Sequence, residues 1–472
     1  MDCDTAVANT PFGPIRGVPE SAGLVFRGIR YATAERFEAP IAVTGWEGEL
    51  DASADGPQCP QLFGMLERAL GGSATTSSED CLSLNVYTPA CDDRRRPVMV
   101  WIHGGGFTTG SGSMPWYHGG ALASRGDVVV VAINYRLGVF GFSGRTNCGL
   151  RDQIAALEWV HACIGAFGGD AASVTIVGES AGGASVVALM ATPAANGLFH
   201  RAVAMSPSLG QLRSGERADD ALAQFVAAAG VEHLDDLRLV PVDALLDVQR
   251  EILKPTSAGF TGFSPCTDGD LVPRPIIESA GANPVPLMIG TTRDEMRLFH
   301  AFDPAVNALD DAAVAVQAER RFPGRGDEVV RRYQAARSHT APSLTYSAII
   351  TDELFRMPML ALADARSEAG LPTWVYWFTW ASPAFNGILG SCHAVDIPFL
   401  FDNLHHPGVE QFLGADPNRS RVALAYGDAV IAHATHAQPG WPAHHPTSRA
   451  TMVFDVHSRV ELDPDFQIRS MW

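Results

Sequence analysis

The chain has 472 residues, of which 46% are hydrophobic and 18% charged, a composition typical of a large globular protein. Its formal net charge of −18 argues against nucleic acid or an anionic membrane surface as a partner. The longest apolar runs, such as residues 128–133, are far too short to cross a bilayer. The first residues are acidic and lack the basic and then apolar profile of a signal peptide, which predicts a cytoplasmic protein.

The N-terminal part of the chain predicts short strands joined by turns. Glycines in residues 12–17 and 23–28 are typical of hairpins. Residues 71–78 are rich in glycine, serine and threonine and predict a polar loop. Residues 82–87 then alternate between apolar and polar side chains, which predicts a half-buried strand.

A different pattern begins at Pro97. Residues 98–102 and 127–133 are continuous apolar runs, as in parallel strands that are covered on both faces. Apolar residues spaced by three or four positions predict a helix within 152–167, and residues 174–177 predict the next strand. This alternation favours the α/β class, with a mainly parallel sheet flanked by helices.

The C-terminal half predicts mostly helix. The expected helices cover residues 218–229, 242–253 and 312–338, and the next strands cover 286–290 and 374–380. We interpret the whole chain as one domain with helical insertions around 211–260 and 303–370. Such insertions could form a lid over an active site or serve only as structural cover, and the sequence does not choose between these two roles.

The strand at 174–177 runs into Gly178-Glu-Ser-Ala-Gly182, a G-x-S-x-G sequence. This pattern is typical of a nucleophile elbow, a strand-to-helix turn that lifts its serine clear of the sheet. Side chains at Gly178 and Gly182 would collide across such a tight turn. Ser180 is therefore the candidate nucleophile, and a plain glycine-rich loop is the alternative.

A serine hydroxyl needs a base to remove its proton and an anionic group to orient that base. In folds with this elbow the acid follows a later strand and the histidine comes after it. The strand at 286–290 leads directly to Asp294 and Glu295, and the local sequence does not choose between them. A surface pair of acids without a role is the alternative.

His393 is the favoured base because it follows the strand at 374–380 and precedes an apolar segment. A buried structural histidine is the alternative. Most of the other histidines after Ser180 are expected to be solvated, and these include His433, His436, His444 and His445.

Trp101-Ile-His-Gly-Gly-Gly-Phe107 follows a predicted strand and matches the glycine-rich loop that supplies oxyanion donors in lipases and esterases. The paired histidines at 405–406 and 444–445 lack carboxylate or thiol partners at ligand spacing, so no zinc site is expected. The sequence contains neither a P-loop nor a G-x-G-x-x-G motif.

Taken together, these segments resemble the type-B carboxylesterase/lipase family, which includes cholinesterases and bacterial para-nitrobenzyl esterases. The resemblance runs over nearly the whole chain. The matching segments are residues 26–29, 31–32, 78–89, 103–107, 134–138, 167–170, 178–183, 290–295, 392–394 and 449–455.

The resemblance implies an α/β-hydrolase fold and a serine carboxylesterase that needs no metal or organic cofactor. It implies that Ser180 is the nucleophile, His393 the base and Glu295, rather than Asp294, the acid. The residues that match the family's oxyanion donors are Gly105, Gly106 and Ala181. The expected substrates are small to medium, fairly apolar esters.

Several alternatives stay open. An amidase, a carbamate hydrolase or a lactone hydrolase would use the same groups, and a non-catalytic interaction protein could share the fold. The resemblance also matches Cys59 and Cys81 to a disulfide of secreted relatives. Such a bridge would stabilise the fold by ~3 kcal/mol, but a reducing cytoplasm would oppose its formation. The sequence does not predict the oligomeric state.

Overall fold

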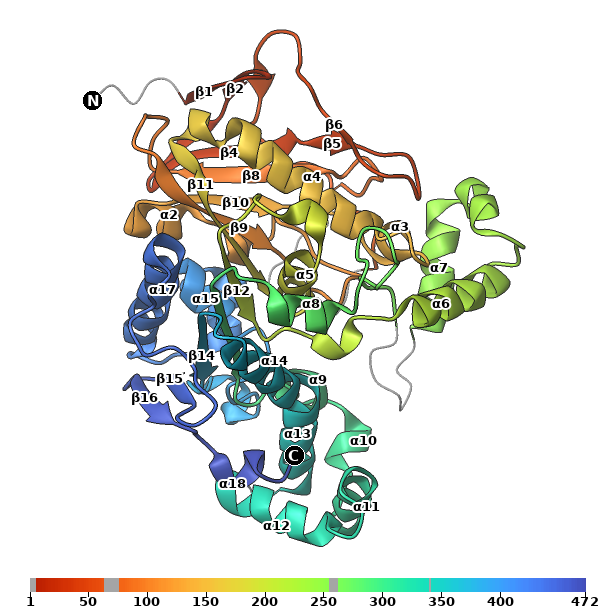
Figure 1. Ribbon diagram of the computed structural model, residues 1–472, viewed down its shortest axis with the longest axis vertical. Helices are drawn as coiled ribbons and strands as arrows, with labels where there is room; N and C mark the ends of the chain where they lie inside the picture. The colour runs from red at the N-terminus through yellow and green to blue at the C-terminus, as the bar shows by residue number, and fades with distance from the viewer. Residues whose placement is uncertain (1–5, 63–75, 254–261, 339–340) are drawn as a thin grey trace.

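A twisted sheet of eleven strands runs through the part of the chain that the computed structural model describes, which is residues 6–62, 76–253, 262–338 and 341–472 (Figure 1). In their order across the sheet, the strands are β16 (Arg459–Leu462), β15 (Ala450–Phe454), β14 (Thr373–Phe378), β13 (Leu287–Thr292), β12 (Arg201–Met205), β11 (Gly169–Glu179), β9 (Arg96–Ile102), β10 (Val129–Ile133), β8 (Ser83–Thr88), β4 (Gly23–Arg30) and β3 (Val18–Glu20).

The middle of the sheet, from β15 to β10, is parallel, and antiparallel strands flank it on both sides. Gly178 pairs with Ile102, and Glu179 pairs with Met205. Met205 in turn pairs with Gly290. Because the carboxyl ends of neighbouring parallel strands lie at one edge of a sheet, the loops after β9, β11, β12, β13 and β14 meet there.

The continuous apolar runs form buried strands, as the sequence predicts. Every residue of β10, β13 and β14 is buried. The prediction that residues 82–87 are half buried is wrong, because all of β8 is buried. Its polar Asn85 accepts a hydrogen bond from the Gly28 N–H at 2.8 Å and donates one to Asp55 at 2.9 Å. Hydrogen bonding, rather than solvent, therefore explains the polar positions of this strand.

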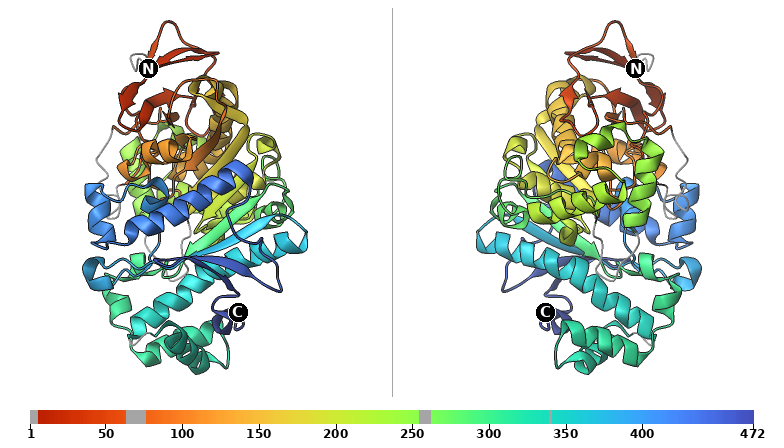
Figure 2. Two further views of the ribbon diagram at one scale, coloured as in Figure 1. Left: turned by 90° about the vertical axis from the view of Figure 1, so that its left-hand side faces the viewer. Right: turned by 90° about the vertical axis from the view of Figure 1, so that its right-hand side faces the viewer.

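Helices cover both faces of the sheet, and each face has its own hydrophobic core (Figures 1 and 2). One face carries α2 (Gly120–Gly126), α15 (Ile397–Phe401) and α17 (Arg419–His436). The other face carries α4 (Cys148–Cys163), α5 (Ala181–Met190), α8 (Ile276–Ala282) and α14 (Met357–Glu368), and α3 (Gly138–Phe142) packs beside α4.

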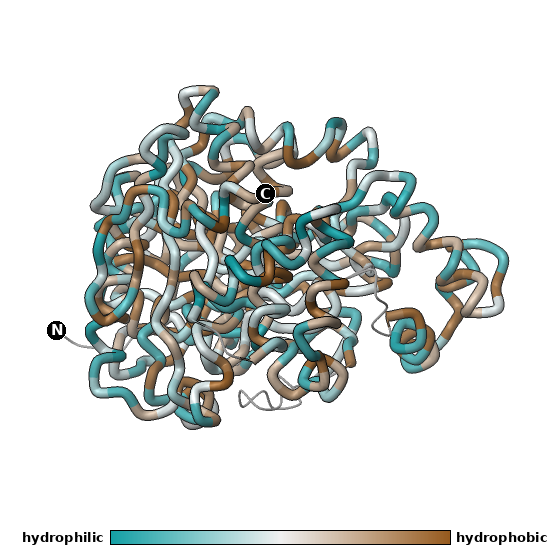
Figure 3. Tube along the Cα trace, turned by 90° about the horizontal axis from the view of Figure 1, so that it is seen from below, coloured by the Kyte–Doolittle hydropathy of each residue, from teal (hydrophilic) through white to brown (hydrophobic). Residues whose placement is uncertain are grey.

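Two helical segments lie between strands of the sheet. The first contains α6 (Gly215–Ala228), a 3₁₀ segment η5 (Leu234–Leu239) and α7 (Val242–Ile252). The second contains α9 (Arg297–His300), α10 (Pro304–Asn307), α11 (Asp311–Arg321), α12 (Gly326–Arg337), α13 (Pro342–Thr351) and a π-helical turn η6 (Asp352–Arg356). The first segment stands away from the sheet, and its trace alternates between hydrophilic and hydrophobic positions, as expected of amphipathic helices (Figure 3).

The prediction of one helical stretch over 312–338 is wrong. The structure has two helices, α11 and α12, which are separated by a turn at Phe322–Arg325. Proline lacks the N–H that a continued helix needs, and Gly324 adopts a φ of +77°, which favours glycine. The Pro323-Gly324 pair therefore accounts for the break.

The predicted N-terminal hairpins are present. β1 (Val7–Thr10) pairs antiparallel with β2 (Gly13–Arg16), and β3 pairs antiparallel with β4. In addition, β2 pairs with β7 (Leu50–Asp51), and β5 (Ala32–Thr33) pairs with β6 (Ile41–Ala42). Most of the loop predicted at 71–78 lies outside the described residues. The remaining short helices are η1 (Pro115–Tyr117), η2 (Ile164–Phe167), η3 (Pro193–Ala195), η4 (Leu209–Gln211), η7 (Ala384–Gly387), α16 (Pro407–Leu413) and α18 (Phe466–Arg469). None of the helices in the described ranges has the length and apolar character that a membrane span needs.

Two of the four histidines expected to be solvated are buried. His433 is fully buried in α17, where Nε2 lies 3.1 Å from the Ala202 carbonyl and burial lowers its pKa to about 4. His444 is also buried, and its Nε2 lies 2.8 Å from Asp364 of α14. His436 and His445 are exposed, as predicted. The difference arises because long-range packing, rather than local polarity, decides which histidines reach solvent.

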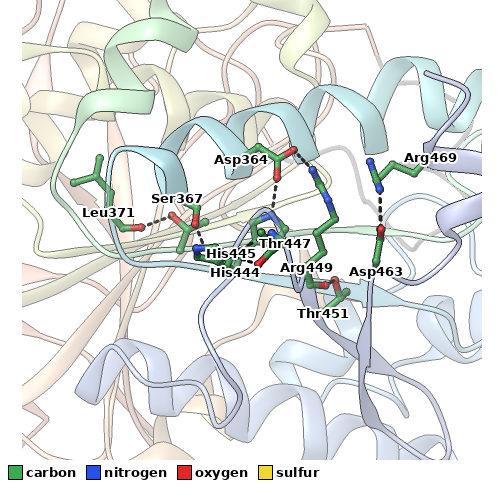
Figure 4. Close-up of polar contacts among 11 residues, drawn as sticks. Asp364, Ser367, Leu371, His444, His445, Thr447, Arg449, Thr451, Asp463 and Arg469 are labelled. Carbon is green, nitrogen blue, oxygen red and sulfur yellow. Dashed lines mark hydrogen bonds and ion pairs between the residues drawn. The ribbon is translucent and has the colours of Figure 1, made fainter.

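Asp364 joins the C-terminal segment to α14 (Figure 4). Its two carboxylate oxygens contact His444 and Arg449, each at 2.8 Å. The Ser367 hydroxyl, one turn further along α14, donates a hydrogen bond to the His444 carbonyl at 2.7 Å. These contacts hold the segment that leads into β15.

Cys59 and Cys81 are both buried free thiols in the structure. The N–H of Leu137 donates to Cys59 Sγ at 3.2 Å. A hydrogen bond with Cys59, together with burial, raises the pKa of Cys81 well above its ordinary value. The side chains of Cys59 and Cys81 are therefore close enough to interact.

Candidate active site

Ser180 occupies a sharp turn between β11, which ends at Glu179, and α5, which begins at Ala181. Its backbone has φ 58° and ψ −118°, outside the regions that a residue with a side chain ordinarily adopts. Its N–H donates to the Met205 carbonyl of the neighbouring strand at 2.9 Å. Strained backbone of this kind clusters at functional sites, and here it points to the exposed end of a nucleophile elbow.

Close packing explains the glycines of this turn. A Cβ atom on Gly178 would lie 2.4 Å from the Gly182 carbonyl oxygen. A Cβ atom on Gly182 would lie 2.0 Å from the carbonyl oxygen of Ile102, at the end of β9. These distances leave no room for side chains, so the steric requirement predicted at both positions holds in the structure.

The glycine loop after β9 lies directly against this turn. A Cβ atom on Gly104 would be 2.9 Å from Glu179 Oε2 and 3.2 Å from Ser180 Cβ. Gly105 and Gly106 follow with φ values of 106° and 61°. Among the described residues, no backbone carbonyl accepts the N–H of Gly105, Gly106 or Ala181. The glycine loop and the elbow therefore carry three backbone N–H groups that no backbone carbonyl of the described residues accepts.

Buried side chains hold the base of the glycine loop. The Tyr135 hydroxyl donates to the His103 carbonyl at 2.8 Å, and the two rings stack with centroids 4.5 Å apart. His103 Nδ1 lies 2.8 Å from the Gly104 carbonyl. Burial lowers the pKa of His103 to about 4, so the ring is neutral and Nδ1 can donate to that carbonyl. The loop is therefore supported by Tyr135, which lies in the matching segment 134–138 but has no role in the predicted site.

His393 Nδ1 lies 2.6 Å from Oε2 of Glu295. Glu295 is fully buried, and its other oxygen accepts hydrogen bonds from the Thr292 N–H at 2.7 Å and the Ser206 hydroxyl at 2.6 Å. The carboxylate is thus held by three donors from separate segments. Such a group can fix the orientation of the imidazole and stabilise its positive form.

Asp294 makes different contacts from its neighbour. It pairs with Arg293 at 2.9 Å and accepts the N–H of Ser391 at 2.9 Å. Burial alone would raise the pKa of Asp294, but Arg293 and Arg297 hold it below its ordinary value. In the structure it is therefore Glu295, and not Asp294, that contacts His393. Asp294 instead joins the loop after β13 to the loop that carries His393.

The second nitrogen of His393 faces Glu179. Nε2 lies 3.1 Å from Glu179 Oε1, and both side chains are buried. Burial alone would lower the pKa of His393, but Glu179 and Glu295 raise it to about 9. Burial raises the pKa of Glu179 to about 8. Within the described residues no hydrogen bond joins Ser180 to His393, and Glu179 Oε1 has no hydrogen-bond partner, so its contact with Nε2 is one of charge.

A second buried acid lies beneath this pair. Asp396 is fully buried, and its Oδ2 accepts hydrogen bonds from Tyr376 at 3.2 Å and from Tyr426 at 3.3 Å. Burial and the nearby Glu295 raise its pKa to about 7. Neither Asp396 nor Ser206 belongs to a recognisable motif, whereas Glu179 stands inside the elbow sequence and could have been singled out there.

Aromatic side chains surround the imidazole. The ring of the buried Phe355, from the π-helical turn, lies 5.0 Å from the His393 ring, and that of Phe299 lies 5.5 Å from it. Phe302 and Phe385 are well exposed and contact each other at 5.7 Å. The second helical segment therefore contributes an apolar side chain directly to the site.

The sequence matches a known family over almost its whole length. Residues 4–448 match the sequence profile described as the carboxylesterase family. The chain belongs to the carboxylesterase family. It is a serine carboxylic ester hydrolase with the α/β-hydrolase fold.

Individual relatives cover nearly the whole carboxylesterase chain. The para-nitrobenzyl esterase of Bacillus subtilis (strain 168) is 36% identical, and the match covers 98% of this chain and 97% of that protein. The phenmedipham hydrolase of Pseudarthrobacter oxydans is also 36% identical, over 95% and 94% of the two chains. The crystal structure of the Geobacillus stearothermophilus carboxylesterase EST55 superposes with a TM-score of 0.87 at 36% identity, covering 99% of this chain and 100% of the other.

Proposed function

We propose that this carboxylesterase hydrolyses small to medium, fairly apolar esters through an acyl-enzyme intermediate on Ser180. In this proposal His393 is the base and Glu295 orients it. The main support is the 2.6 Å contact between His393 Nδ1 and the buried Glu295 carboxylate, at the sheet edge where the elbow also lies. Serine, histidine and a carboxylate from three separate loops are what acyl transfer by this route needs.

The chemistry begins when the Ser180 hydroxyl donates a hydrogen bond to Nε2 of His393, while Nδ1 stays on Glu295. Hydrogen bonds of this kind often tighten only when substrate is bound. The serine oxygen then attacks the ester carbonyl while its proton moves to Nε2. The negative charge that forms on the carbonyl oxygen is stabilised by backbone donors, for which the candidates are the N–H groups of Gly105, Gly106 and Ala181.

The tetrahedral intermediate collapses when Nε2 returns its proton to the leaving alcohol. Water then attacks the acyl-enzyme as it loses a proton to the same nitrogen. The second tetrahedral intermediate collapses when Nε2 returns this proton to the Ser180 oxygen, and the acid product leaves. Protonation of Glu179, whose pKa is raised by burial, removes one negative neighbour from His393 and favours the neutral imidazole that this step needs.

The substrate preference is argued from the side chains around the imidazole. Phe299 and Phe355 present apolar rings within 5.5 Å of His393, measured between ring centroids. A substrate with apolar groups on its acyl or alcohol side would remove this surface from water when it binds. Similarity to a para-nitrobenzyl esterase supports the same choice.

The test is Ser180→Ala, assayed on para-nitrophenyl butyrate, with exposed Ser53→Ala as the control. We expect Ser180→Ala to lose about 10⁴-fold or more in kcat and Ser53→Ala to match the wild type.

A matched pair of variants tests the role of the acid. Glu295→Gln should reduce kcat strongly, whereas Asp294→Asn should chiefly lower stability. Near-normal kcat in Ser180→Ala or Glu295→Gln would overturn the assignment, and a panel of amides and carbamates would show whether esters are preferred.

A further inference from the structure

Gly110 follows the glycine loop, and the side-chain amide of Gln61 holds it in place. Gln61 Nε2 donates to the Gly110 carbonyl at 2.9 Å, and Oε1 accepts the Gly110 N–H at 2.7 Å. Nε2 also donates to the Cys59 carbonyl at 3.1 Å. One side chain therefore satisfies both backbone groups of Gly110, as a paired strand would, and both N–H groups of the amide have an acceptor.

Gly110 packs directly against the glycine loop. A Cβ atom on Gly110 would lie 2.4 Å from His103 Nδ1 and 2.6 Å from the Gly104 carbonyl oxygen. Gly104 in turn lies against the elbow, since a Cβ atom there would be 3.2 Å from Ser180 Cβ. No free space separates Gly110 from the Gly104 carbonyl, so the position of one limits the position of the other.

The Gly104 carbonyl sets the direction of one candidate oxyanion donor. It faces His103 Nδ1 at 2.8 Å, on the side where Gly110 packs. None of the described peptide bonds is cis, so the Gly105 N–H, which shares a planar trans peptide with this carbonyl, points in the opposite direction. The contacts that fix the Gly104 carbonyl therefore also fix where the Gly105 N–H points.

A tight turn links this donor to Gly110. The Gly105 carbonyl accepts the N–H groups of Thr108 and Thr109, both at 3.0 Å. By the same trans geometry, the Gly106 N–H points away from that turn. The turn ends at Gly110, so its last residue is the one that the distant amide holds.

We propose that Gln61 is a positioning residue for ester hydrolysis, which holds Gly110 and so keeps the backbone donors of the glycine loop directed at the oxyanion. This inference rests on the proposed function, in which the N–H groups of Gly105 and Gly106 are such donors. Gln61 lies 49 residues before Gly110, outside the sequence of the loop. Donors held in place before the reaction lower its barrier, because they need no rearrangement when the negative charge forms.

The test compares Gln61→Met with the wild type in steady-state hydrolysis of para-nitrophenyl butyrate. Methionine has nearly the length of glutamine but lacks the amide, so it keeps the packing and loses the hold on Gly110. We expect kcat to fall about tenfold and KM to stay within about twofold, because the donors act mainly on the oxyanion. Gln334→Met is the matched control and should keep the wild-type kcat, since Gln334 is also half-buried and donates to Asp311, at 3.0 Å, between α12 and α11.

A transition-state analogue separates positioning from a loss of stability. With hexyl trifluoromethyl ketone, the Ser180 oxygen adds to the ketone carbon, the hydroxyl proton moves to His393 and the negative charge stays on the former carbonyl oxygen. We expect Gln61→Met to weaken inhibition by this ketone about tenfold and to leave inhibition by hexyl methyl ketone, which binds as the neutral ketone, within about twofold. A merely structural role would leave the ratio of the two inhibition constants unchanged.

An unchanged kcat in Gln61→Met would overturn the proposal, as would an unchanged ratio of the two inhibition constants. If Gln61→Met fails to fold, Gln61→Glu replaces it, because it keeps an acceptor for the Gly110 N–H but sets a carboxylate oxygen against the Gly110 carbonyl. An unchanged kcat in that folded variant would also overturn the proposal. Gly105→Ala separates this proposal from the proposed function. If only Gly105→Ala loses activity, the role of Gln61 alone is wrong, and if both variants keep the wild-type kcat, the oxyanion donors lie elsewhere.

Discussion

The Ser206 hydroxyl donates a hydrogen bond to Oε1 of Glu295 at 2.6 Å, while Oε2 of the same carboxylate contacts His393 at 2.6 Å. Ser206 follows β12 directly, and its N–H donates to the Gly290 carbonyl of β13 at 2.8 Å. The hydroxyl therefore ties the proposed acid to the neighbouring strand and limits how far the carboxylate can turn.

We predict that Ser206→Ala lowers kcat about tenfold and leaves KM within about twofold, because a buried carboxylate that loses one donor orients His393 less well. Ser208→Ala is the matched control, since its hydroxyl donates to Gln211 instead. Steady-state kinetics on a para-nitrophenyl ester measure both variants. An unchanged kcat in Ser206→Ala would show that Thr292 and His393 are sufficient to hold Glu295.

Glu179 governs the pH dependence that we predict. The base must be neutral to accept a proton, and Glu179 is a negative neighbour that raises the pKa of His393. Glu179→Gln removes this charge, so the pKa of His393 falls and the acid limb of the kcat/KM profile moves to lower pH by about one unit.

The measurement is the kcat/KM profile between about pH 5 and pH 10 for the wild type and Glu179→Gln. For the wild type, whose His393 has a pKa of about 9, activity should still be rising above neutral pH. Glu158→Gln, at an exposed position of α4, is the control and should leave the profile unchanged. An acid limb in the same place for all three proteins would remove Glu179 from this role.

The parts of the site that could be predicted from the sequence are those where the chemistry constrains the local backbone. Ser180 and the glycines around it form one short motif, because the turn admits no larger residues at Gly178 and Gly182. The strands before these motifs were also predictable, since a buried parallel strand needs a continuous apolar run.

The supporting residues could not be predicted, because their positions depend on the register of distant strands. Ser206 reaches Glu295 only because β12 and β13 are neighbours in the sheet. Asp396 meets Tyr376 and Tyr426 from different elements. The choice between Asp294 and Glu295 likewise depends on which carboxylate faces the loop of His393, and no local pattern records that geometry.

Gly105 provides a test of the glycine loop. Its φ of 106° disfavours any side chain, and a Cβ atom would lie 2.2 Å from the Thr109 carbonyl oxygen. Gly105→Ala must therefore move the loop, and we predict that kcat falls by about 10²–10³-fold as an oxyanion donor is displaced. Gly210→Ala is the control, because no atom lies within 4 Å of its added Cβ. Comparable kcat values for the two variants would place the oxyanion donors elsewhere.

Asp364 provides a test of stability away from the site. Its carboxylate contacts the buried His444 and Arg449, which hold the C-terminal segment to α14. We predict that Asp364→Ala lowers the free energy of unfolding by about 2 kcal/mol at neutral pH, because two polar groups lose their partner. Glu368→Ala, at an exposed position of the same helix, should change it by less than about 0.5 kcal/mol.

The effect of Asp364→Ala should depend on pH. Burial alone would raise the pKa of Asp364, but His444 and Arg449 hold it below its ordinary value. A carboxylate whose folded pKa is lowered stabilises the protein above its unfolded pKa of about 4, and this stabilisation is lost as the pH falls further. Urea unfolding of the wild type and Asp364→Ala should therefore give a difference that is largest near neutral pH and shrinks in acid. A difference that stays constant from neutral pH into acid would mean that packing, rather than the charge of Asp364, holds the C-terminal segment in place.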